Sequence, residues 1–212
     1  SFSPGVEKGK SKVVVSRLGY EWSHRSRRQV FTVSSTLSVG LGVLGATKQT
    51  DDLPDSKFVA GLLQAQWARR LRPWNAQILA RGDVQLSDSS LLGFEQFSIG
   101  GHATVRGYRE NTLVRDQGWL ASLELRVPVF HRLGKKMAVA LGVFVDTGRA
   151  WNKERTTSEP ERLTSVGISS HWTINDNINV QIDWATPLEK VPNNPEYDLQ
   201  DDGLHFRLSA AY

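Results

Sequence analysis

A glycine-flanked segment of the chain carries one arginine whose chemistry suits the binding of a carboxylate. The segment reads FSIGGHATVRGY over residues 97–108, with Arg106 between Val105 and Gly107. A guanidinium group is a planar fork of N–H donors that can bind both oxygens of a carboxylate at once. An aspartate in a water-poor position would therefore be a suitable partner for this arginine.

The candidate partner is Asp146, the lone acidic residue near the end of an otherwise apolar segment that reads GVFVDTG. On a strand, alternate residues share a face. Asp146 would then share its face with Ala138, Ala140, Gly142 and Phe144, opposite a uniformly apolar face. We expect Asp146 to point inward, where the small residues leave room for a loop. The alternative is that Arg106 is solvated and Asp146 independently caps a strand end.

The other residues of catalytic or metal-binding type form no recognisable constellation. The five histidines are scattered, and none has the spacing of a metal site. Glu124 and Asp183 are expected to point inward from different strands, which favours a polar lumen over an acid/base pair. There is no phosphate-binding loop of Walker type. We therefore expect no catalytic residue, no metal and no cofactor, in a protein that is not an enzyme.

The elements that must position these residues have a hydrophobic period of two. Between residues 177 and 188, for example, apolar side chains alternate with Asn179, Gln181 and Asp183, which is typical of a half-apolar strand. The pattern predicts nine strands, at 12–22, 29–39, 57–70, 74–86, 118–128, 136–147, 161–172, 177–187 and 203–212. These lengths suit tilted membrane strands of about nine to eleven residues better than soluble strands of about five or six.

The connections between the predicted strands alternate in length. Short connections fall at 23–28, 71–73, 129–135 and 173–176, and long ones at 40–56, 87–117, 148–160 and 188–202. Short turns on one side, long loops on the other and aromatic residues near strand ends are typical of outer-membrane barrels. The sequence therefore predicts an all-β, transmembrane antiparallel barrel. The alternative, a soluble sandwich with a tryptophan-filled core, fits poorly with polar faces rich in Gln, Asn, Arg and Asp.

Composition excludes several other classes of protein. The 212 residues contain no cysteine, which excludes disulfides and thiolate metal sites. No apolar run approaches the roughly 18 residues of a membrane helix. The net charge of +4 is spread along the chain, and without a basic stripe interleaved with aromatic residues we expect no nucleic-acid partner.

The two ends of the chain lead to different expectations. Single-chain bacterial barrels have even strand numbers, so nine strands predict that earlier strands lie outside this chain. Residues 1–11 then fall on the side of the long loops. The last predicted strand carries Phe206 and ends on Tyr212. We expect these two aromatic residues to mark the natural end of a barrel and to serve as a C-terminal signal for the barrel-assembly machinery.

The loop at 87–117 and a later strand resemble a known superfamily. FSIGGHATVRGYRENTLVRDQGW resembles the motif loop of BamA-like and two-partner-secretion proteins, whose Val-Arg-Gly-Tyr tip folds into the barrel. GVFVDTG resembles the partner motif of the same proteins. ENTLVRDQG followed by SLELRVP is closer to the TpsB transporters than to BamA. The motif residues here are Val105, Arg106, Gly107 and Tyr108 in the loop, Phe144, Asp146 and Gly148 on the strand, and Gly100, Gly101, Glu110 and Asp116 in support.

The resemblance implies a position in the barrel and a contact within it. Five strands follow the motif loop, which matches strands twelve to sixteen of a sixteen-strand barrel. Residues 1–212 would then be its C-terminal part, roughly nine strands, while earlier strands and periplasmic POTRA domains would lie outside this chain. Arg106 would bond Asp146 in the lumen and fix the loop 87–117 in an inward position needed for secretion.

The function implied by the resemblance is protein export. A TpsB transporter in the bacterial outer membrane, surrounded by its lipid, exports one large TpsA-type partner protein, which can be an adhesin, a haemolysin or a contact-dependent toxin. One alternative is a BamA-like factor that inserts other barrels. Another is a passive porin with an ordinary constriction loop. The number of upstream POTRA domains would separate the first two, and conductance without export would favour the third.

Overall fold

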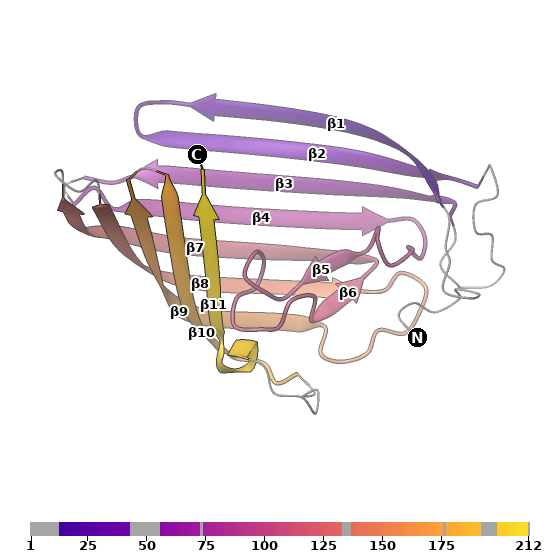
Figure 1. The fold of residues 1–212 in the computed structure, drawn as a ribbon. Helices are drawn as coiled ribbons and strands as arrows, with labels where there is room; N and C mark the ends of the chain where they lie inside the picture. Colours follow the sequence, from indigo (N-terminus) through magenta and orange to yellow (C-terminus); the bar gives the residue numbers. More distant parts are fainter. Residues whose placement is uncertain are drawn as a thin grey trace.

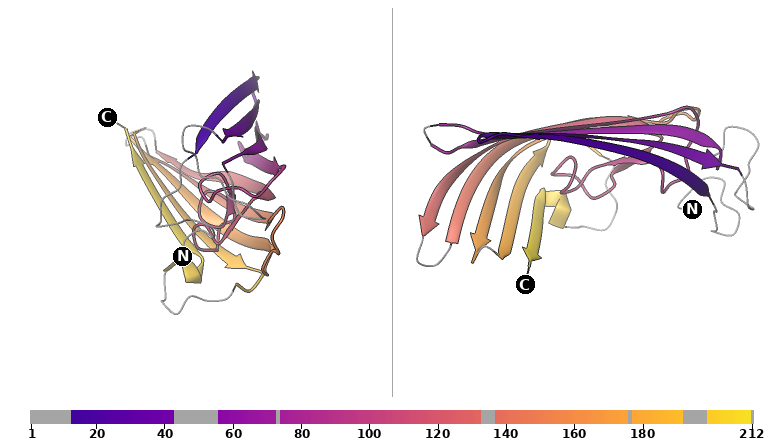
Figure 2. Two further views of the ribbon diagram at one scale, coloured as in Figure 1. Left: turned by 90° about the vertical axis from the view of Figure 1, so that its right-hand side faces the viewer. Right: turned by 90° about the horizontal axis from the view of Figure 1, so that it is seen from above.

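The main element of the structure, a computed structural model, is a nine-stranded antiparallel sheet. The described residues are 13–42, 56–72, 74–132, 137–175, 177–191 and 199–211. The elements, in chain order, are β1 (Val14–Arg25), β2 (Gln29–Leu41), β3 (Phe58–Arg70), β4 (Gln77–Ser87), β5 (Phe97–Ile99), β6 (Leu113–Arg115), β7 (Gln117–Arg132), β8 (Met137–Trp151), β9 (Arg162–Ile174), β10 (Ile178–Pro187), the 3-10 helix η3 (Leu199–Asp202) and β11 (Leu204–Ala210). The sheet is strongly curved, and its concave side is called the lumen below (Figures 1 and 2).

The nine long strands of the sheet confirm the all-β prediction. Their order is β1-β2-β3-β4-β7-β8-β9-β10-β11, so that each strand pairs with the next long strand of the chain. Several details differ from the prediction. β7 continues to Arg132 instead of ending at 128, and β8 continues to Trp151 instead of ending at 147. β4 begins at Gln77 instead of Trp74, and the loop 87–117 contains a small two-stranded sheet, β5-β6. Strands of three residues are too short to produce a detectable period of two.

The curved sheet has two edges within the described residues, because β1 and β11 each pair on one side only. Residues 1–12 and 212 lie outside the described part of the chain. No helix among the described residues is long and apolar enough to cross a membrane. The described part of the chain is therefore a nine-stranded arc of a barrel wall.

The convex face of the sheet is apolar and the lumen face is polar. On β8, Leu141 and Val143 are 49% and 56% exposed, whereas Phe144 and Asp146 on the other face are buried. Phe206 on β11 is 64% exposed on the convex face. So much exposed apolar surface is incompatible with a soluble monomer and suits lipid. This arrangement contradicts the soluble sandwich and agrees with a transmembrane barrel. The other predicted C-terminal aromatic residue, Tyr212, lies outside the described residues.

The loop between β4 and β7 folds against the lumen face of the sheet, where Figures 1 and 2 show β5, β6 and the segment between them. Its apolar side chains form the largest buried cluster together with residues of β7, β8 and β9. The cluster consists of Phe97, Ile99, Val105, Tyr108, Leu113, Leu120, Ala150 and Leu163. Burial of these side chains gives the loop a fixed seat on the barrel wall.

Candidate functional site

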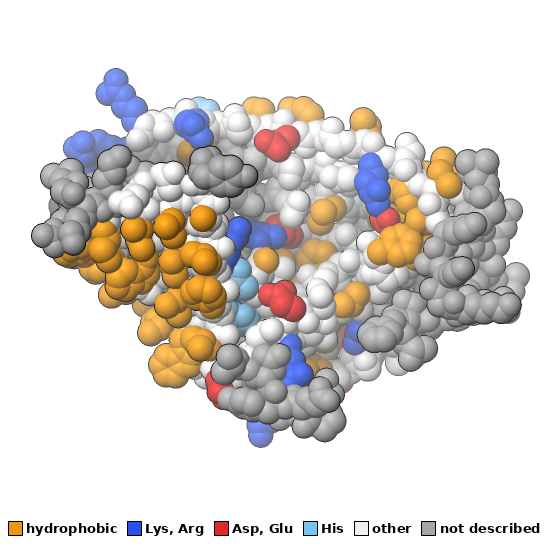
Figure 3. All heavy atoms as spheres, viewed as in Figure 1, with side chains coloured by type: hydrophobic (Ala, Val, Ile, Leu, Met, Phe, Trp, Pro, Cys, Tyr) orange, Lys and Arg blue, Asp and Glu red, His pale blue; other side chains and the backbone are white. Residues whose placement is uncertain are grey.

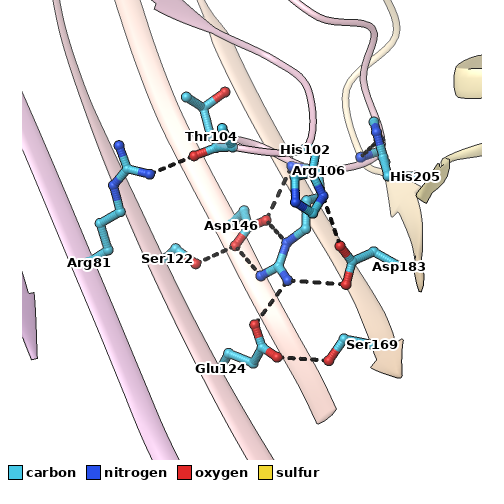
Figure 4. Close-up of polar contacts among 12 residues, drawn as sticks. Arg81, His102, Thr104, Arg106, Ser122, Glu124, Asp146, Ser169, Asp183 and His205 are labelled. Carbon is cyan, nitrogen blue, oxygen red and sulfur yellow. Dashed lines mark hydrogen bonds and ion pairs between the residues drawn. The ribbon is translucent and has the colours of Figure 1, made fainter. Parts of the chain in front are cut away.

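Arg106, at the tip of this loop, is bound by Asp146 of β8 inside the lumen (Figure 4). Its Nε donates to Asp146 Oδ2 at 2.8 Å and its Nη2 to Oδ1 at 3.0 Å. The backbone N–H of Arg106 also donates to Oδ2, at 3.2 Å. The two side chains are 6% and 0% exposed. The contact is thus a bidentate ion pair shielded from water, of the kind expected from the sequence; its role in secretion stays a prediction.

Two further carboxylates surround the same guanidinium group. Arg106 Nη1 donates to Glu124 Oε2 of β7 at 3.0 Å and lies 3.6 Å from Asp183 Oδ1 of β10. The Phe144 ring lies below the guanidinium, whose Cζ is 3.3 Å from the ring centroid, close enough for a cation–π interaction. Arg106 therefore bridges three strands of the wall, and we call Arg106 with Asp146, Glu124 and Asp183 the lumen brace.

Hydroxyl and cationic side chains on the wall hold the carboxylates of the lumen brace in place. Ser122 Oγ donates to Asp146 Oδ1 at 2.6 Å. Glu124 Oε1 accepts hydrogen bonds from Ser169 Oγ at 2.7 Å and Arg126 Nε at 2.6 Å, and lies 3.0 Å from His171 Nε2. A carboxylate fixed in this way loses little further freedom when the arginine docks.

The register of the sheet explains why residues so far apart in sequence meet. Asp146 lies opposite Ser122 of β7 and Ser165 of β9. Asp183 of β10 lies opposite Ser169 and, on the other side, His205 of β11. These residues alternate with lipid-facing ones, so all of them point into the lumen.

The Arg106 guanidinium stays charged in this setting. Burial by itself lowers its pKa, but the hydrogen bonds and charge of Asp146 and the charges of Glu124 and Asp183 oppose this effect. The net result is a pKa raised above the ordinary value of an arginine. Arg106 is thus positively charged at any physiological pH.

The backbone of the tip is shaped by Gly107, the residue after the arginine. Gly107 has a φ of +89°, a region that residues with a side chain rarely adopt. A Cβ atom at this position would lie 2.9 Å from Ala185 Cβ on β10. Its N–H donates to His205 Nε2 at 2.9 Å. Glycine is required here because the tip makes a left-handed turn directly against the wall.

Glu110 supports the tip through the turn that begins at Gly100 and Gly101. The carboxylate of Glu110 accepts a hydrogen bond from the backbone N–H of His102, at 2.8 Å. A Cβ atom at Gly101, whose φ is +101°, would collide with that carboxylate at 2.1 Å. Thr104 closes the same turn, because its Oγ1 accepts from the Gly100 N–H at 2.9 Å.

Asp116 fixes the base of the loop and is fully buried. Its Oδ1 accepts hydrogen bonds from the Leu91 N–H at 2.9 Å and from Gln96 Nε2 at 2.8 Å. Its Oδ2 accepts from the Lys153 N–H at 3.1 Å, in the β8–β9 connection. One carboxylate therefore joins both ends of the motif loop to a neighbouring loop.

Tyr108 is seated in the apolar cluster, with its hydroxyl at the outer edge of that cluster. The hydroxyl lies 2.8 Å from the Thr164 carbonyl oxygen and 2.9 Å from Glu189 Oε2. Burial disfavours the phenolate and raises the pKa of Tyr108 from 10.0 to about 12. The docked loop thus requires the neutral phenol.

The raised pKa of Tyr108 predicts an alkaline limit to loop docking. A proton held more tightly in the docked state stabilises it fully below the ordinary pKa of 10.0, and this stabilisation is lost as the pH rises to about 12. The check is the tyrosinate absorbance of the wild type minus that of Tyr108→Phe across this range. We expect a midpoint near 12; a midpoint at 10 would mean that the hydroxyl is solvated.

Gly148, the last residue of the strand motif, lies on β8 beside the apolar cluster. A Cβ atom there would meet the Trp119 carbonyl oxygen at 2.9 Å and Ile99 Cδ1 at 3.3 Å. The absence of a side chain at this position therefore leaves room for the loop and for β7.

Among the described residues, no group of three or more His, Asp or Glu side chains could hold a metal ion.

A cavity of about 440 Å³ lies in the lumen beside the loop tip. Basic residues and amides dominate its polar lining, and charged and histidine side chains gather in the hollow of the molecule in Figure 3. The polar residues are Thr32, Gln66, Arg81, His102, Thr104, Arg106, Ser122, Glu124, Arg126, Gln181 and Arg207. The docked loop therefore leaves part of the lumen open.

Sequence reasoning did not assign Glu124, Asp183 and His205 to the arginine site. In the sequence, each of them is recognisable only as an acidic or basic residue at an inward position of a strand. Such residues occur in any polar lumen and do not by themselves indicate a contact with the arginine. Only the register and curvature of the sheet select those that reach the loop tip.

A curved, lipid-compatible antiparallel sheet with an arginine-tipped loop docked in its lumen defines an outer-membrane barrel with an internal loop. The comparison with known families makes the assignment specific. The model of the haemolysin secretion/activation protein family ShlB/FhaC/HecB matches residues 5–172. The chain belongs to this family, and the outer membrane is its location.

Two relatives agree with this assignment. The outer membrane transporter CdiB of Dickeya dadantii (strain 3937) is 28% identical in an alignment of 166 residues that covers 73% of this chain and 29% of the relative. The solved structure of CdiB from Escherichia coli superposes with a TM-score of 0.75 at 21% identity, over 95% of this chain and 37% of that chain. The second likeness shows the fold. This chain spans about a third of the length of these relatives.

Proposed function

We propose that the chain supplies part of the wall and the inward loop of a pore through which a secreted partner protein crosses the outer membrane. The observation that carries the proposal is the lumen brace, in which one buried arginine ties a long loop to three strands. Buried ion pairs contribute little net stability compared with apolar packing. A group of this kind is better understood as fixing the position of the loop.

The partner we propose is one large TpsA-type protein, such as an adhesin, a haemolysin or a contact-dependent toxin. Membership of the haemolysin secretion/activation family supports this class of partner, as does the similarity to the outer membrane transporter CdiB of Dickeya dadantii. The complete transporter would include earlier strands and periplasmic POTRA domains in addition to residues 1–212. Its assembly would use Phe206 and Tyr212 as a signal to the barrel-assembly machinery.

The two other candidate functions receive less support. A BamA-like insertion factor fits the motif loop equally well, but the matching family model is that of secretion/activation proteins. A passive porin needs a constriction loop, yet not one whose tip is tied to three strands by buried charges. Neither alternative nor the main proposal requires catalysis.

The proposed function is tested by export of a partner protein. The complete transporter that carries this chain is produced in a bacterium without such a system, together with a candidate partner directed to the periplasm. We expect the partner in the medium only when the transporter is present. Retention of every candidate partner in the periplasm, while insertion of unrelated barrels depends on the protein, would instead support the assembly factor.

A further inference from the structure

Both described ends of the connection between β10 and β11 contact the motif loop at the rim of the sheet. Tyr108 is the first point of attachment. Its hydroxyl contacts Glu189 Oε2 at 2.9 Å and accepts a hydrogen bond from the Glu189 N–H at 3.0 Å. Glu189 is itself tied to β9, because its carboxylate accepts from the Thr164 N–H. The phenol is therefore held by a residue with a fixed place on the wall.

The next two residues of the loop are held by the far end of the same connection. Arg109 donates from Nε and Nη2 to the two oxygens of Asp201, each at 2.6 Å. The Glu110 N–H donates to Gln200 Oε1 at 2.9 Å. Three consecutive loop residues are thus attached to the β10–β11 connection, and we call Glu189, Gln200 and Asp201 the rim clasp.

The residues of the rim clasp are anchored to the sheet. Asp201 and Gln200 belong to η3, which leads directly into β11. At its end, Gly203 accepts a hydrogen bond from the Ala185 N–H of β10 through its carbonyl oxygen, at 2.9 Å. The clasp therefore moves with β10 and β11 and can hold the loop in place.

The rim clasp and the lumen brace differ in exposure. Arg109 and Asp201 are 28% and 32% exposed, whereas Arg106 and Asp146 are 6% and 0% exposed. A partly exposed ion pair is weak and screened by salt, while a buried one is strongly disrupted when a partner is lost. The clasp is consequently the attachment that opens more readily.

We propose that Glu189 and Asp201 are positioning residues whose contacts with Tyr108 and Arg109 determine how often the loop tip leaves the lumen. The part of this proposal that concerns secretion rests on the proposed function, whereas the part that concerns the position of the loop does not. A partner protein in transit would displace the loop by opening the clasp before the brace. Loss of the clasp would then expose the tip without removing any charge that touches Arg106.

The test uses a thiol at the tip of a chain that has no cysteine of its own. Val105 is 0% exposed when the loop is docked, so Val105→Cys reports exposure of the tip. In the complete transporter, with any other cysteine replaced, a membrane-impermeant maleimide labels the thiol on intact cells. We expect slow labelling, accelerated about tenfold in Glu189→Ala/Asp201→Ala because two weak attachments are lost.

Arg149→Gln is the matched control, because it removes an ion pair with Glu161 on the same rim that involves no loop residue. Its labelling rate should equal that of the reporter alone. Equal rates in the clasp variant and this control would overturn the proposal, as would fast labelling with the clasp intact. If the double variant fails to insert, Tyr108→Phe replaces it; an unchanged rate there would overturn the proposal too.

Partner export measured on the same cells separates this proposal from the proposed function. The clasp variant could label faster while even the unaltered transporter exports no partner. This result would support the proposed role of the rim clasp and contradict the proposed function as an export pore. Normal export with unchanged labelling would contradict the clasp alone.

Discussion

Arg106→Ala is expected to leave an inserted barrel that no longer exports its partner. The substitution leaves Asp146, Glu124 and Asp183 facing one another with their shared cation removed. Breaking a buried ion pair on one side typically destabilises the docked arrangement by about 3–5 kcal/mol, which corresponds to roughly two to four orders of magnitude in a docking equilibrium. The loop should therefore leave the lumen while the hydrogen-bonded wall persists.

The measurement is the amount of partner in the medium per inserted transporter. Arg149→Ala is the matched control, since it removes an ion pair with Glu161 that involves no residue of the lumen brace. Arg106→Lys keeps the charge and loses the planar fork, so it should restore only part of the export. Full export by Arg106→Ala at normal barrel levels would contradict the role of the arginine.

Gly107→Ala is expected to displace the loop tip without changing any charge. The added Cβ would lie 2.9 Å from Ala185 Cβ, at a φ of +89°. A left-handed conformation at a residue with a side chain costs about 1–3 kcal/mol, and the steric contact adds to this. The tip should rise from the wall, lose the hydrogen bond from its N–H to His205 and draw Arg106 away from Asp146.

The check is again partner export, together with maleimide labelling of Val105→Cys in the same background. Gly61→Ala is the control, because a Cβ at Gly61 meets nothing within 4 Å. Ala185→Gly removes the atom that the new methyl group strikes and should partly rescue Gly107→Ala. Normal export by Gly107→Ala would show that export tolerates a displaced loop tip, which would contradict this prediction.

The sequence predicts the wall better than the loop, for a physical reason. Lipid on one side and a polar lumen on the other impose an alternation along every strand, so β8 and β10 can be recognised from their own residues. The hairpin β5-β6 has no such constraint. Its strands are three residues long and are held by the apolar cluster around Ile99 and Leu120, to which residues of β7, β8 and β9 contribute.

The candidate site, too, could be predicted only in part from the sequence. Arg106 and Asp146 could be proposed as partners because each is the single charged residue in a distinctive local pattern, and the resemblance of both segments to a known pair of motifs favoured this pairing over a solvated arginine. Glu124 and Asp183 could be oriented toward the lumen by alternation, but their convergence on one guanidinium depends on the register between strands. The rim clasp at Glu189 could not be inferred, since the connection that carries it has no regular pattern.

The lumen brace and the rim clasp together suggest how one loop can be both secure and movable. The brace holds the tip by buried charges, and the clasp holds the residues after it by partly exposed ones. Asp116 fixes the base in both states if its contacts with Leu91 and Lys153 persist. The loop would then swing about its base when the tip is released.

The most direct test of the account is a double-mutant cycle on partner export, with Arg106→Ala, Asp146→Ala and the two combined. Amounts of inserted transporter are matched, and the partner in the medium is measured. If the two side chains act as one unit, each single substitution abolishes export and the double variant is no worse than either, since coupled residues are strongly non-additive. Normal export by both single variants would contradict the account.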